Sequence, residues 1–288
     1  MKVGFLGLGT MGAAMASRLV EKVDLVPWNR SPAALEPLKS QSLQPASDAK
    51  EALACELSFS MLANDAVTDE ILDRENLTSG TTHICMASIS PALATKLAAR
   101  FEDADATFVS APVVGRPNVA ESGQLNILAA GPKGAIDKAQ PLFDLMGRKT
   151  WILGETASKA NLVKIAINYN ILHTIQSLAE SVAIVEKHGI DANEFIDVLT
   201  GTLFGGVAHT GYGSQVASSS YEPTMFSIEL GRKDLALAMQ AAEEVNLELP
   251  TASLLDELLE QAMADPNLAS KDWAAMAEIT LGRGPNKG

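Results

Sequence analysis

The stretch KVGFLGLGTMG, residues 2–12, decides the fold, because it joins a short apolar run to three glycines in the pattern GxGxxG. The run predicts a β-strand over Lys2 to Leu8, and the spacing of apolar residues predicts a helix over Thr10 to Glu21. A glycine-rich turn between a strand and a helix is typical of a phosphate site, because the helix N-terminus presents unpaired N–H groups and a positive dipole. We therefore expect residues 2–12 to open a dinucleotide-binding unit.

The positions of this motif have separate tasks. Gly7 permits a tight turn, Gly9 lets the backbone approach a pyrophosphate, and Gly12 lets the helix pack closely on the strand. Thr10 and Met11 begin the helix and are expected to lie beside the same phosphates. The alternative is that the glycines only form a turn.

The end of the second predicted strand, Asp24 to Asn29, indicates which nicotinamide cofactor is bound. An acidic residue there would accept a hydrogen bond from the ribose 2′-hydroxyl and would repel a 2′-phosphate. This strand ends instead in Asn29, Arg30 and Ser31, and Arg30 offers a planar guanidinium to a phosphate. We expect NADP(H) to be preferred over NAD(H). The alternative is that Arg30 is an ordinary solvated surface charge.

Apolar β-type runs alternate with helical patterns through the first half of the chain, which predicts a parallel sheet covered by helices. A turn and a helix are expected over Ser31 to Ser40. Further strands, which bring the total to six or seven, are expected at residues 57–62, 82–86, 107–111, 125–130 and 150–153. The predicted fold class is α/β, with a Rossmann domain, a doubly wound parallel sheet, over residues 1–158.

The pattern changes after Ser158, where helical spacing replaces strand-like runs. We expect residues 159–288 to form an all-α domain for substrate binding and dimerisation. Its first segment, Lys159 to His188, contains no Pro or Gly and predicts one interdomain helix of roughly 45 Å. The Gly- and Ser-rich segment Gly201 to Ser220 is expected to be a loop.

Composition excludes several classes of function. The chain has 288 residues, 47% hydrophobic and 20% charged, which is typical of a folded protein with two domains. A formal net charge of −13 disfavours nucleic-acid binding, and no apolar stretch reaches the roughly 20 residues that span a bilayer. We expect a cytoplasmic protein with reduced Cys55 and Cys85, because the N-terminus has no secretory pattern. The four histidines are scattered, which predicts no metal site.

Lys164 and Asn168 lie four residues apart on the long predicted helix, so they project from one face within reach of one small ligand. The residues between and beside them are apolar, and such surroundings would lower the pKa of a lysine amine toward a range useful for proton transfer. From spacing alone, a surface lysine is the simpler interpretation.

Several segments resemble the β-hydroxyacid dehydrogenase family, which includes 3-hydroxyisobutyrate dehydrogenase, tartronate semialdehyde reductase and the glyoxylate and succinic semialdehyde reductases. Residues 3–12, continuing to Met15 and Ala16, are similar to the cofactor fingerprint of the family, and residues 29–31 are similar to its NADP-type variant. Residues 164–168, KIAIN, resemble its KxxxN motif. The resemblance covers almost the whole chain.

The resemblance implies that Lys164 is the general acid or base and that Asn168 orients the substrate. It implies further cofactor contacts at Leu62, Ala63, Ser88 in the loop Ser88-Ile89-Ser90-Pro91, and Lys233. It implies substrate contacts at Ser110, Val114, Gly115, Arg116 and Asp234. The implied reaction is hydride transfer between nicotinamide and the carbonyl carbon of a small hydroxyacid or semialdehyde, in a cleft between the domains.

The substrate segment departs from the family pattern Asp-Ala-Pro-Val-Ser-Gly-Gly. Ser110 stands for the Asp, Val114 for the Ser and Arg116 for the second Gly. Val114 cannot donate a hydrogen bond to a substrate carboxylate, whereas the Arg116 fork would either hold an anion or fill the space of the usual substrate. We therefore expect a small anionic substrate, which the sequence does not name.

Two alternatives of other kinds stay open. An imine reductase would use the same architecture to reduce a C=N bond, although such enzymes usually carry another residue at position 164. A non-catalytic scaffold would bind NADP(H) after losing the catalytic lysine, whereas Lys164, Asn168 and Lys233 are all present. Full 6-phosphogluconate dehydrogenases share the dinucleotide motif but have a much longer C-terminal part, so we do not expect this chain to be one of them. The Ala- and Leu-rich helices predict a homodimer or a higher homo-oligomer.

Overall fold

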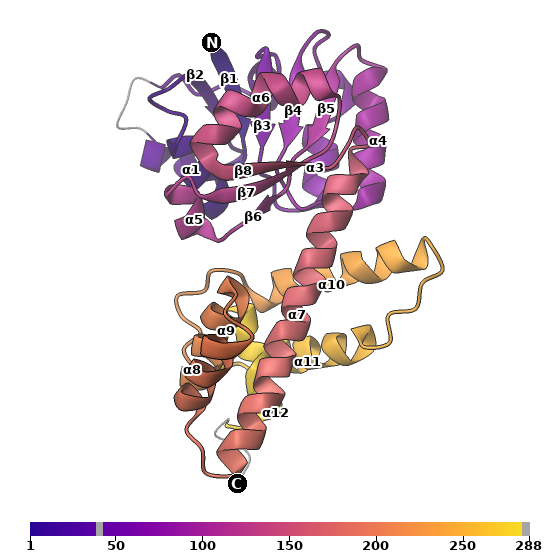
Figure 1. Cartoon of the computed structure of the whole chain (residues 1–288). Helices are drawn as coiled ribbons and strands as arrows, with labels where there is room; N and C mark the ends of the chain where they lie inside the picture. The colour runs from indigo at the N-terminus through magenta and orange to yellow at the C-terminus, as the bar shows by residue number, and fades with distance from the viewer. Residues whose placement is uncertain (39–42, 284–288) are drawn as a thin grey trace. The chain divides into compact units, whose positions relative to one another are not determined.

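A computed structural model describes residues 1–38 and 43–283 (Figure 1). The chain divides into two compact units, Met1–Lys164 and Ile165–Gly288. Helix α7, Ser158–Lys187, crosses this division and matches the long helix that the sequence predicts.

The first unit contains a five-stranded parallel sheet in the order β2-β1-β3-β4-β5. Because the chain runs from β1 to β2 on one side and continues with β3 on the other, the strand order reverses beside β1. Ligands of open α/β sheets bind at such a switch point, beyond the carboxyl ends of the strands. The strands are β1 (Lys2–Leu6), β2 (Asp24–Trp28), β3 (Leu57–Ser60), β4 (Thr82–Cys85) and β5 (Thr107–Ser110).

A second, three-stranded sheet has the order β6-β7-β8, and a bridge between Ser110 and Ala130 connects it to β5. Its strands are β6 (Val113–Val114), β7 (Leu125–Ala129) and β8 (Gly147–Ile152). The seven predicted strands are confirmed. The two-residue strand β6, which the sequence did not predict, pairs antiparallel with β7. A strand so short leaves no periodic signal in the sequence.

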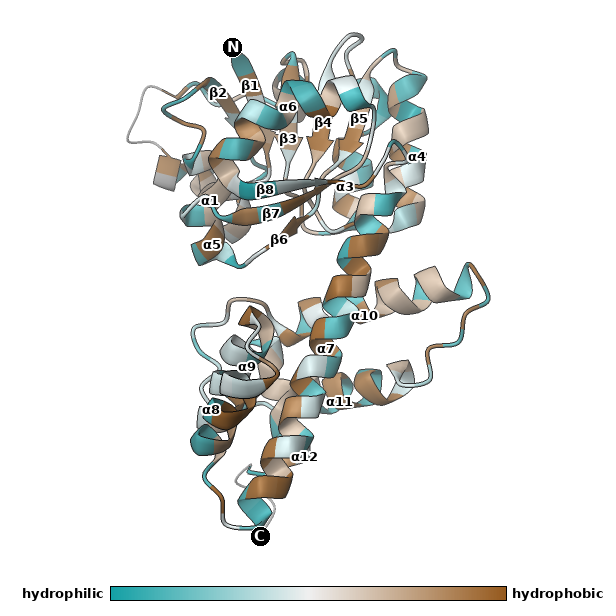
Figure 2. Cartoon of the chain, viewed as in Figure 1, coloured by the Kyte–Doolittle hydropathy of each residue, from teal (hydrophilic) through white to brown (hydrophobic). Residues whose placement is uncertain are grey.

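Helices cover both faces of the main sheet. Successive side chains of a strand point to opposite faces, so neighbouring apolar residues of one strand are buried in two different cores. On one face, Phe5 of β1 packs in a core with helices α1 (Thr10–Ser17) and α6 (Lys133–Met146). On the other face, Leu6 packs with α2 (Ala49–Leu53) and α4 (Pro91–Glu102). In Figure 2, helix α6 shows alternating hydrophilic and hydrophobic residues along its length, as expected for a helix with one buried face. The doubly wound α/β class is thereby confirmed.

The remaining helical segments of this unit are short. They are η1 (Pro32–Leu38), α3 (Asp65–Ile71), η2 (Arg74–Asn76) and α5 (Pro117–Glu121). The helix predicted over residues 31–40 is a 3-10 helix as far as Leu38, and residues 39 and 40 lie outside the described part of the chain. Helix α1 ends at Ser17 rather than at Glu21, because residues 18–22 form turns.

The second unit is built from helices around one apolar core. Trp273 lies at its centre, buried against Phe226 and Tyr212, and its indole N–H donates to the Tyr212 hydroxyl at 3.1 Å. After α7 the helices are α8 (Ala192–Thr202), α9 (Val207–Ser218), α10 (Ile228–Glu243), α11 (Ala252–Ala264), η3 (Trp273–Met276) and α12 (Ala277–Leu281).

The prediction of a loop over Gly201–Ser220 was wrong, since most of this segment is helix α9 (Val207–Ser218). Tyr212 and Val216 are buried in the core, so packing outweighs the low helix propensity of the glycines and serines. Gly213 lies where α9 packs closely on α8, because a Cβ there would be 3.0 Å from the Ile196 side chain. One glycine that indicated a loop thus lies at the close contact of two helices, whereas a Cβ on Gly201, Gly206 or Gly211 would meet no atom within 4 Å.

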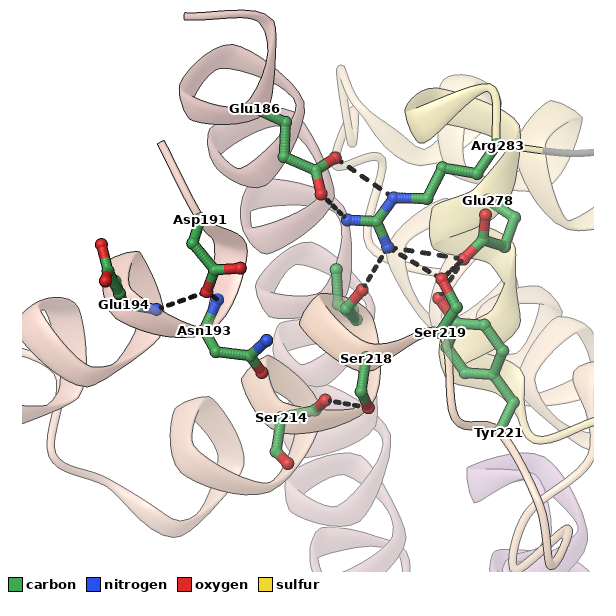
Figure 3. A network of polar contacts seen from close by, with 11 residues as sticks. Glu186, Asp191, Asn193, Glu194, Ser214, Ser218, Ser219, Tyr221, Glu278 and Arg283 are labelled. Carbon is green, nitrogen blue, oxygen red and sulfur yellow. Dashed lines mark hydrogen bonds and ion pairs between the residues drawn. The ribbon is translucent and has the colours of Figure 1, made fainter. Parts of the chain in front are cut away.

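A polar network fixes the end of the second unit (Figure 3). Arg283 donates to Glu186 near the end of α7 at 3.1 Å and to Ser219 after α9 at 2.8 Å. Glu278 of α12 accepts from the Tyr221 hydroxyl at 2.7 Å. Three segments distant in sequence are thus joined by charge-assisted hydrogen bonds.

Candidate functional site

The cofactor residues predicted in the first unit follow the strands at one edge of the main sheet, and the predicted substrate residue Ser110 lies at the same edge. Gly7 follows β1, Asn29 follows β2, Leu62 follows β3 and Ser88 follows β4, while Ser110 ends β5. Because all five strands are parallel, these residues lie at the same carboxyl edge. The edge is where a doubly wound sheet binds a dinucleotide.

The glycine-rich turn has the shape of a phosphate cradle. Gly7 has a φ of +88°, and a Cβ there would lie 2.4 Å from the Met61 carbonyl oxygen. A Cβ on Gly12 would lie 1.9 Å from the Gly7 carbonyl oxygen. Both glycines are therefore required by the turn itself.

Gly9 differs from its two neighbours, because it is exposed and a Cβ there would meet no atom within 4 Å. Helix α1 starts directly after Gly9, with no side chain capping its first N–H groups. Thr10 is exposed and Met11 is half-buried at this helix start. The open space and the uncapped N–H groups fit the pyrophosphate of a dinucleotide.

Asn29 connects the end of β2 to the glycine-rich turn. Its Oδ1 accepts from the Leu8 N–H at 2.8 Å, and its Nδ2 donates to the Ser31 carbonyl at 3.0 Å. Arg30 and Ser31 are exposed beyond it. The Arg30 guanidinium donates to the Glu70 carboxylate of α3 at 2.7 Å.

The loop from Ser88 to Pro91 is held at several points. The Asp65 carboxylate accepts from the Ser90 N–H at 3.1 and 3.2 Å, and the Ser90 hydroxyl caps α4 through the Leu93 N–H. Ser88 is half-buried, as is Leu62, while Ala63 is exposed. These hydrogen bonds tie the loop that follows β4 to helices α3 and α4.

Asn161, which the sequence analysis did not single out, anchors the first turn of α7. It is 1% exposed, its Nδ2 donates to the Ile89 carbonyl at 3.1 Å, and its Oδ1 accepts from the Ser110 hydroxyl at 2.5 Å. The helix start is thereby tied to the carboxyl ends of β4 and β5. Lys164 is half-buried three residues further on, about one helical turn away.

The predicted substrate residues of the first unit lie in consecutive pieces of structure. Ser110 is fully buried, and its hydroxyl donates to Asn161. Val114 pairs with Asn126 in the second sheet, and Gly115 has a φ of +152°. Arg116 is half-buried and stands at the N-cap of α5.

Three predicted residues of the second unit come together. The Asn168 amide donates to the Asp234 carboxylate, which is 4% exposed and comes from α10. The Lys233 amine lies 4.0 Å from the same carboxylate. A buried carboxylate with a cation nearby and a short amide contact is held in one orientation.

Two buried titratable groups lie in β4, close to this edge. Burial lowers the pKa of His83 to about 3, and its ring nitrogens contact the Ser58 and Ser60 hydroxyls at 2.8 and 2.9 Å. Burial raises the pKa of the Cys85 thiol to about 11. Both groups are therefore neutral at pH 7 and are structural parts of the sheet.

Among residues 1–38 and 43–283, no group of three or more His, Cys, Asp or Glu side chains could hold a metal ion. Within the same ranges, no helix combines the length and the apolar character that a membrane span needs.

Family models match both halves of the chain. The model for the NAD binding domain of 6-phosphogluconate dehydrogenase matches residues 2–154. The model for the NAD-binding of NADP-dependent 3-hydroxyisobutyrate dehydrogenase matches residues 158–280. Together with the glycine-rich turn at the switch point, they define a dinucleotide-binding oxidoreductase.

Individual relatives agree with the family models. The uncharacterized oxidoreductase YfjR of Bacillus subtilis is 32% identical over 96% of this chain and 98% of its own length. The chloroplastic glyoxylate/succinic semialdehyde reductase 2 of Arabidopsis thaliana is 30% identical over 96% of this chain and 79% of its own length. The solved structure of Mycobacterium tuberculosis 3-hydroxyisobutyrate dehydrogenase with L-serine has a TM-score of 0.88 and 25% identity, over 98% of this chain and 99% of that one. This chain therefore belongs to the β-hydroxyacid dehydrogenase family, as an NAD(P)-dependent oxidoreductase of the 3-hydroxyisobutyrate dehydrogenase type.

Proposed function

We propose that this chain uses NADP(H) to reduce a small aldehyde or oxoacid, or to oxidise the corresponding hydroxyacid, with Lys164 as general acid or base. The observation that carries the proposal is the anchoring of α7 by Asn161. Its bonds to Ile89 and Ser110 fix the helix that bears Lys164 to the sheet edge that holds the glycine-rich turn. A catalytic amine needs such support, because small displacements of a reacting group cost much of the rate.

The residues present fit a nicotinamide dinucleotide. Gly7, Gly9 and Gly12 with the start of α1 would hold the pyrophosphate, and Arg30 would hold a 2′-phosphate. Leu62, Ala63 and Ser88, after the ends of β3 and β4, would line the remainder. The family resemblance implies Lys233 as a further cofactor residue. When bound, the cofactor supplies or accepts the hydride at its nicotinamide ring.

Lys164 would move the proton that the reaction requires. In reduction its ammonium donates a proton to the substrate oxygen, and in oxidation its neutral amine removes a proton from the alcohol. A cationic donor beside that oxygen also stabilises the negative charge that develops there. Asn168 would orient the substrate, and its amide is itself positioned by Asp234.

We further propose an anionic substrate. Arg116 lies directly after Gly115 at the start of α5 and offers a guanidinium fork that suits a carboxylate. The glyoxylate/succinic semialdehyde reductase at 30% identity supports small oxoacids and semialdehydes as the first candidates. Val114, Ser110 and Asp234 would complete the substrate contacts.

A screen of NADPH consumption tests the proposed function. Wild-type protein is assayed with glyoxylate, succinic semialdehyde, a neutral short aldehyde and a cyclic imine, beside the variant Arg116→Gly. We expect turnover of the acidic carbonyl substrates and a selective rise in their KM for Arg116→Gly. Equal effects on the neutral aldehyde would remove the anion-binding role from Arg116.

The same screen separates the alternatives. Turnover of the cyclic imine alone would favour an imine reductase, since the C=N bond would then be the reacting group. Calorimetric binding of NADPH with no turnover on the panel would favour a non-catalytic scaffold. Retention of Lys164, Asn168 and Lys233 favours catalysis.

We also propose that residues 1–158 form the cofactor domain and that residues 159–288 form a substrate and dimerisation domain. Support for a homodimer comes from apolar side chains exposed on the second unit, with Val198 65%, Leu203 88% and Val207 91% exposed. Light scattering should give twice the 30.4-kDa chain mass. A single-chain mass at micromolar concentration would contradict the dimer.

A further inference from the structure

We infer that Glu70 is a specificity residue that weakens the preference of this chain for NADP(H) over NAD(H). The inference rests on the proposed function, in which Arg30 receives the 2′-phosphate. Glu70 lies on α3, forty residues after Arg30, yet its carboxylate accepts from the Arg30 guanidinium at 2.7 Å. The arginine that would bind the phosphate is thus already paired with an anion of the protein.

The ion pair between Arg30 and Glu70 is weak enough for a 2′-phosphate to replace Glu70 at the guanidinium. The side chains of Arg30 and Glu70 are 61% and 65% exposed, and an exposed ion pair is worth little because water and salt screen it. A 2′-phosphate carries more charge than a carboxylate and would displace Glu70 from the guanidinium. The displaced carboxylate would remain near the phosphate and repel it.

The same carboxylate would favour the other cofactor. In NAD(H) the ribose ends in a free 2′-hydroxyl, and such sites usually place an acidic residue at the end of the second strand to accept from it. This chain has Asn29 and Arg30 there, and the Asn29 side chain is occupied by Leu8 and Ser31. Glu70 brings an acid next to the Arg30 guanidinium from a different element, helix α3.

The neighbouring acid on α3 has different partners. Asp69 accepts from Lys96 at 2.8 Å and from Arg100 at 2.7 Å, so it is held against α4. Glu70 instead contacts Arg30, which lies two residues after the end of β2. The two adjacent carboxylates therefore serve different sites, one joining α3 to α4 and the other bordering the candidate 2′-phosphate position.

The test compares equilibrium binding of NADPH and NADH to wild type and Glu70→Gln, with Asp137→Asn as the matched control. The Lys133–Asp137 pair is also exposed in the first unit, so its loss removes the same charge elsewhere. We expect Glu70→Gln to raise the ratio of the NADH to the NADPH dissociation constant about fivefold at low salt, and less at high salt. Asp137→Asn should leave the ratio unchanged.

Two results would overturn the inference in distinguishable ways. If both nucleotides bind wild type and Glu70→Gln leaves the ratio within the range of Asp137→Asn, Glu70 has no role and the proposed function stands. If neither nucleotide binds wild type, the assignment of the cofactor site fails and the role of Glu70 fails with it.

Discussion

Two buried asparagines of helix α7, Asn161 and Asn168, meet the cost of burial in different ways. Asn161 lies in the first unit, and its side chain forms hydrogen bonds with two neutral groups, the Ile89 carbonyl and the Ser110 hydroxyl. Asn168 lies in the second unit and donates to the carboxylate of Asp234. Lys164 stands between them, three residues after the first and four before the second.

The two asparagines show that helix α7 is held by different kinds of hydrogen bond in the first and in the second unit. Neutral hydrogen bonds contribute about 1 kcal/mol each, whereas a bond to a buried charge contributes about twice that and costs more when broken. The neutral anchor sets where α7 leaves the sheet. The charged contact fixes the orientation of the amide proposed to hold the substrate.

The largest loss of stability is expected from breaking the charged contact. Asn168→Ala should lower the free energy of unfolding by about 3 kcal/mol, because it removes a donor from the buried Asp234 carboxylate. Denaturant unfolding of Asn168→Ala, Asp234→Ala and the double variant measures the coupling. Additive losses in the double variant would show that the contact contributes nothing.

A smaller loss is expected from the neutral anchor. Asn161→Ala should lower the free energy of unfolding by about 2 kcal/mol, because two weak bonds are lost, and should also reduce kcat about tenfold by displacing Lys164. Ser177→Ala is the control on the same helix, since its hydroxyl bonds to the Thr174 carbonyl one turn before it. An unchanged kcat in Asn161→Ala, with stability lowered, would leave Asn161 a purely structural residue.

His83 extends the comparison of Asn161 and Asn168 to a third buried polar residue. Its partners are neutral, but its own side chain can become charged. Its folded-state pKa of about 3 lies below the ordinary value of 6.5, so the unfolded chain binds a proton that the folded chain refuses between these pH values. Stability should therefore fall as pH drops below about 6.5, by about 1 kcal/mol between pH 7 and pH 5.5. His83→Gln should lose that part of the pH dependence in unfolding titrations. An identical slope in wild type and variant would contradict the assignment.

The sequence predicted the first unit well because its signals are local. Buried parallel strands give continuous apolar runs, and the glycines of residues 7–12 have steric reasons visible in their spacing. The structure of the second unit was harder to predict from the sequence. Residues 201–220 contain glycines and serines that favour a loop, but packing of Tyr212 and Val216 makes them helical.

The residues of the candidate site also fall into two groups, those that a local motif predicts and those that depend on contacts distant in sequence. Lys164 and Asn168 follow from a motif, whereas Asn161 and Glu70 act through partners 51 to 72 residues and 40 residues away in sequence. One signal for Asn161 was present, since Asn161 and Asn168 are seven residues apart and therefore lie on the same face of the helix. No sequence spacing brings Glu70 to Arg30, because that contact depends on how the chain packs α3 near the end of β2.

Single-turnover reduction of the best substrate by Lys164→Ala tests the central claim most directly. Stopped-flow absorbance should show NADPH oxidation slowed by a factor on the order of 100 or more, since the general acid is lost, while the NADPH dissociation constant stays within about threefold of wild type. Oxidation at the wild-type rate in Lys164→Ala would contradict the assignment of Lys164 as the proton donor.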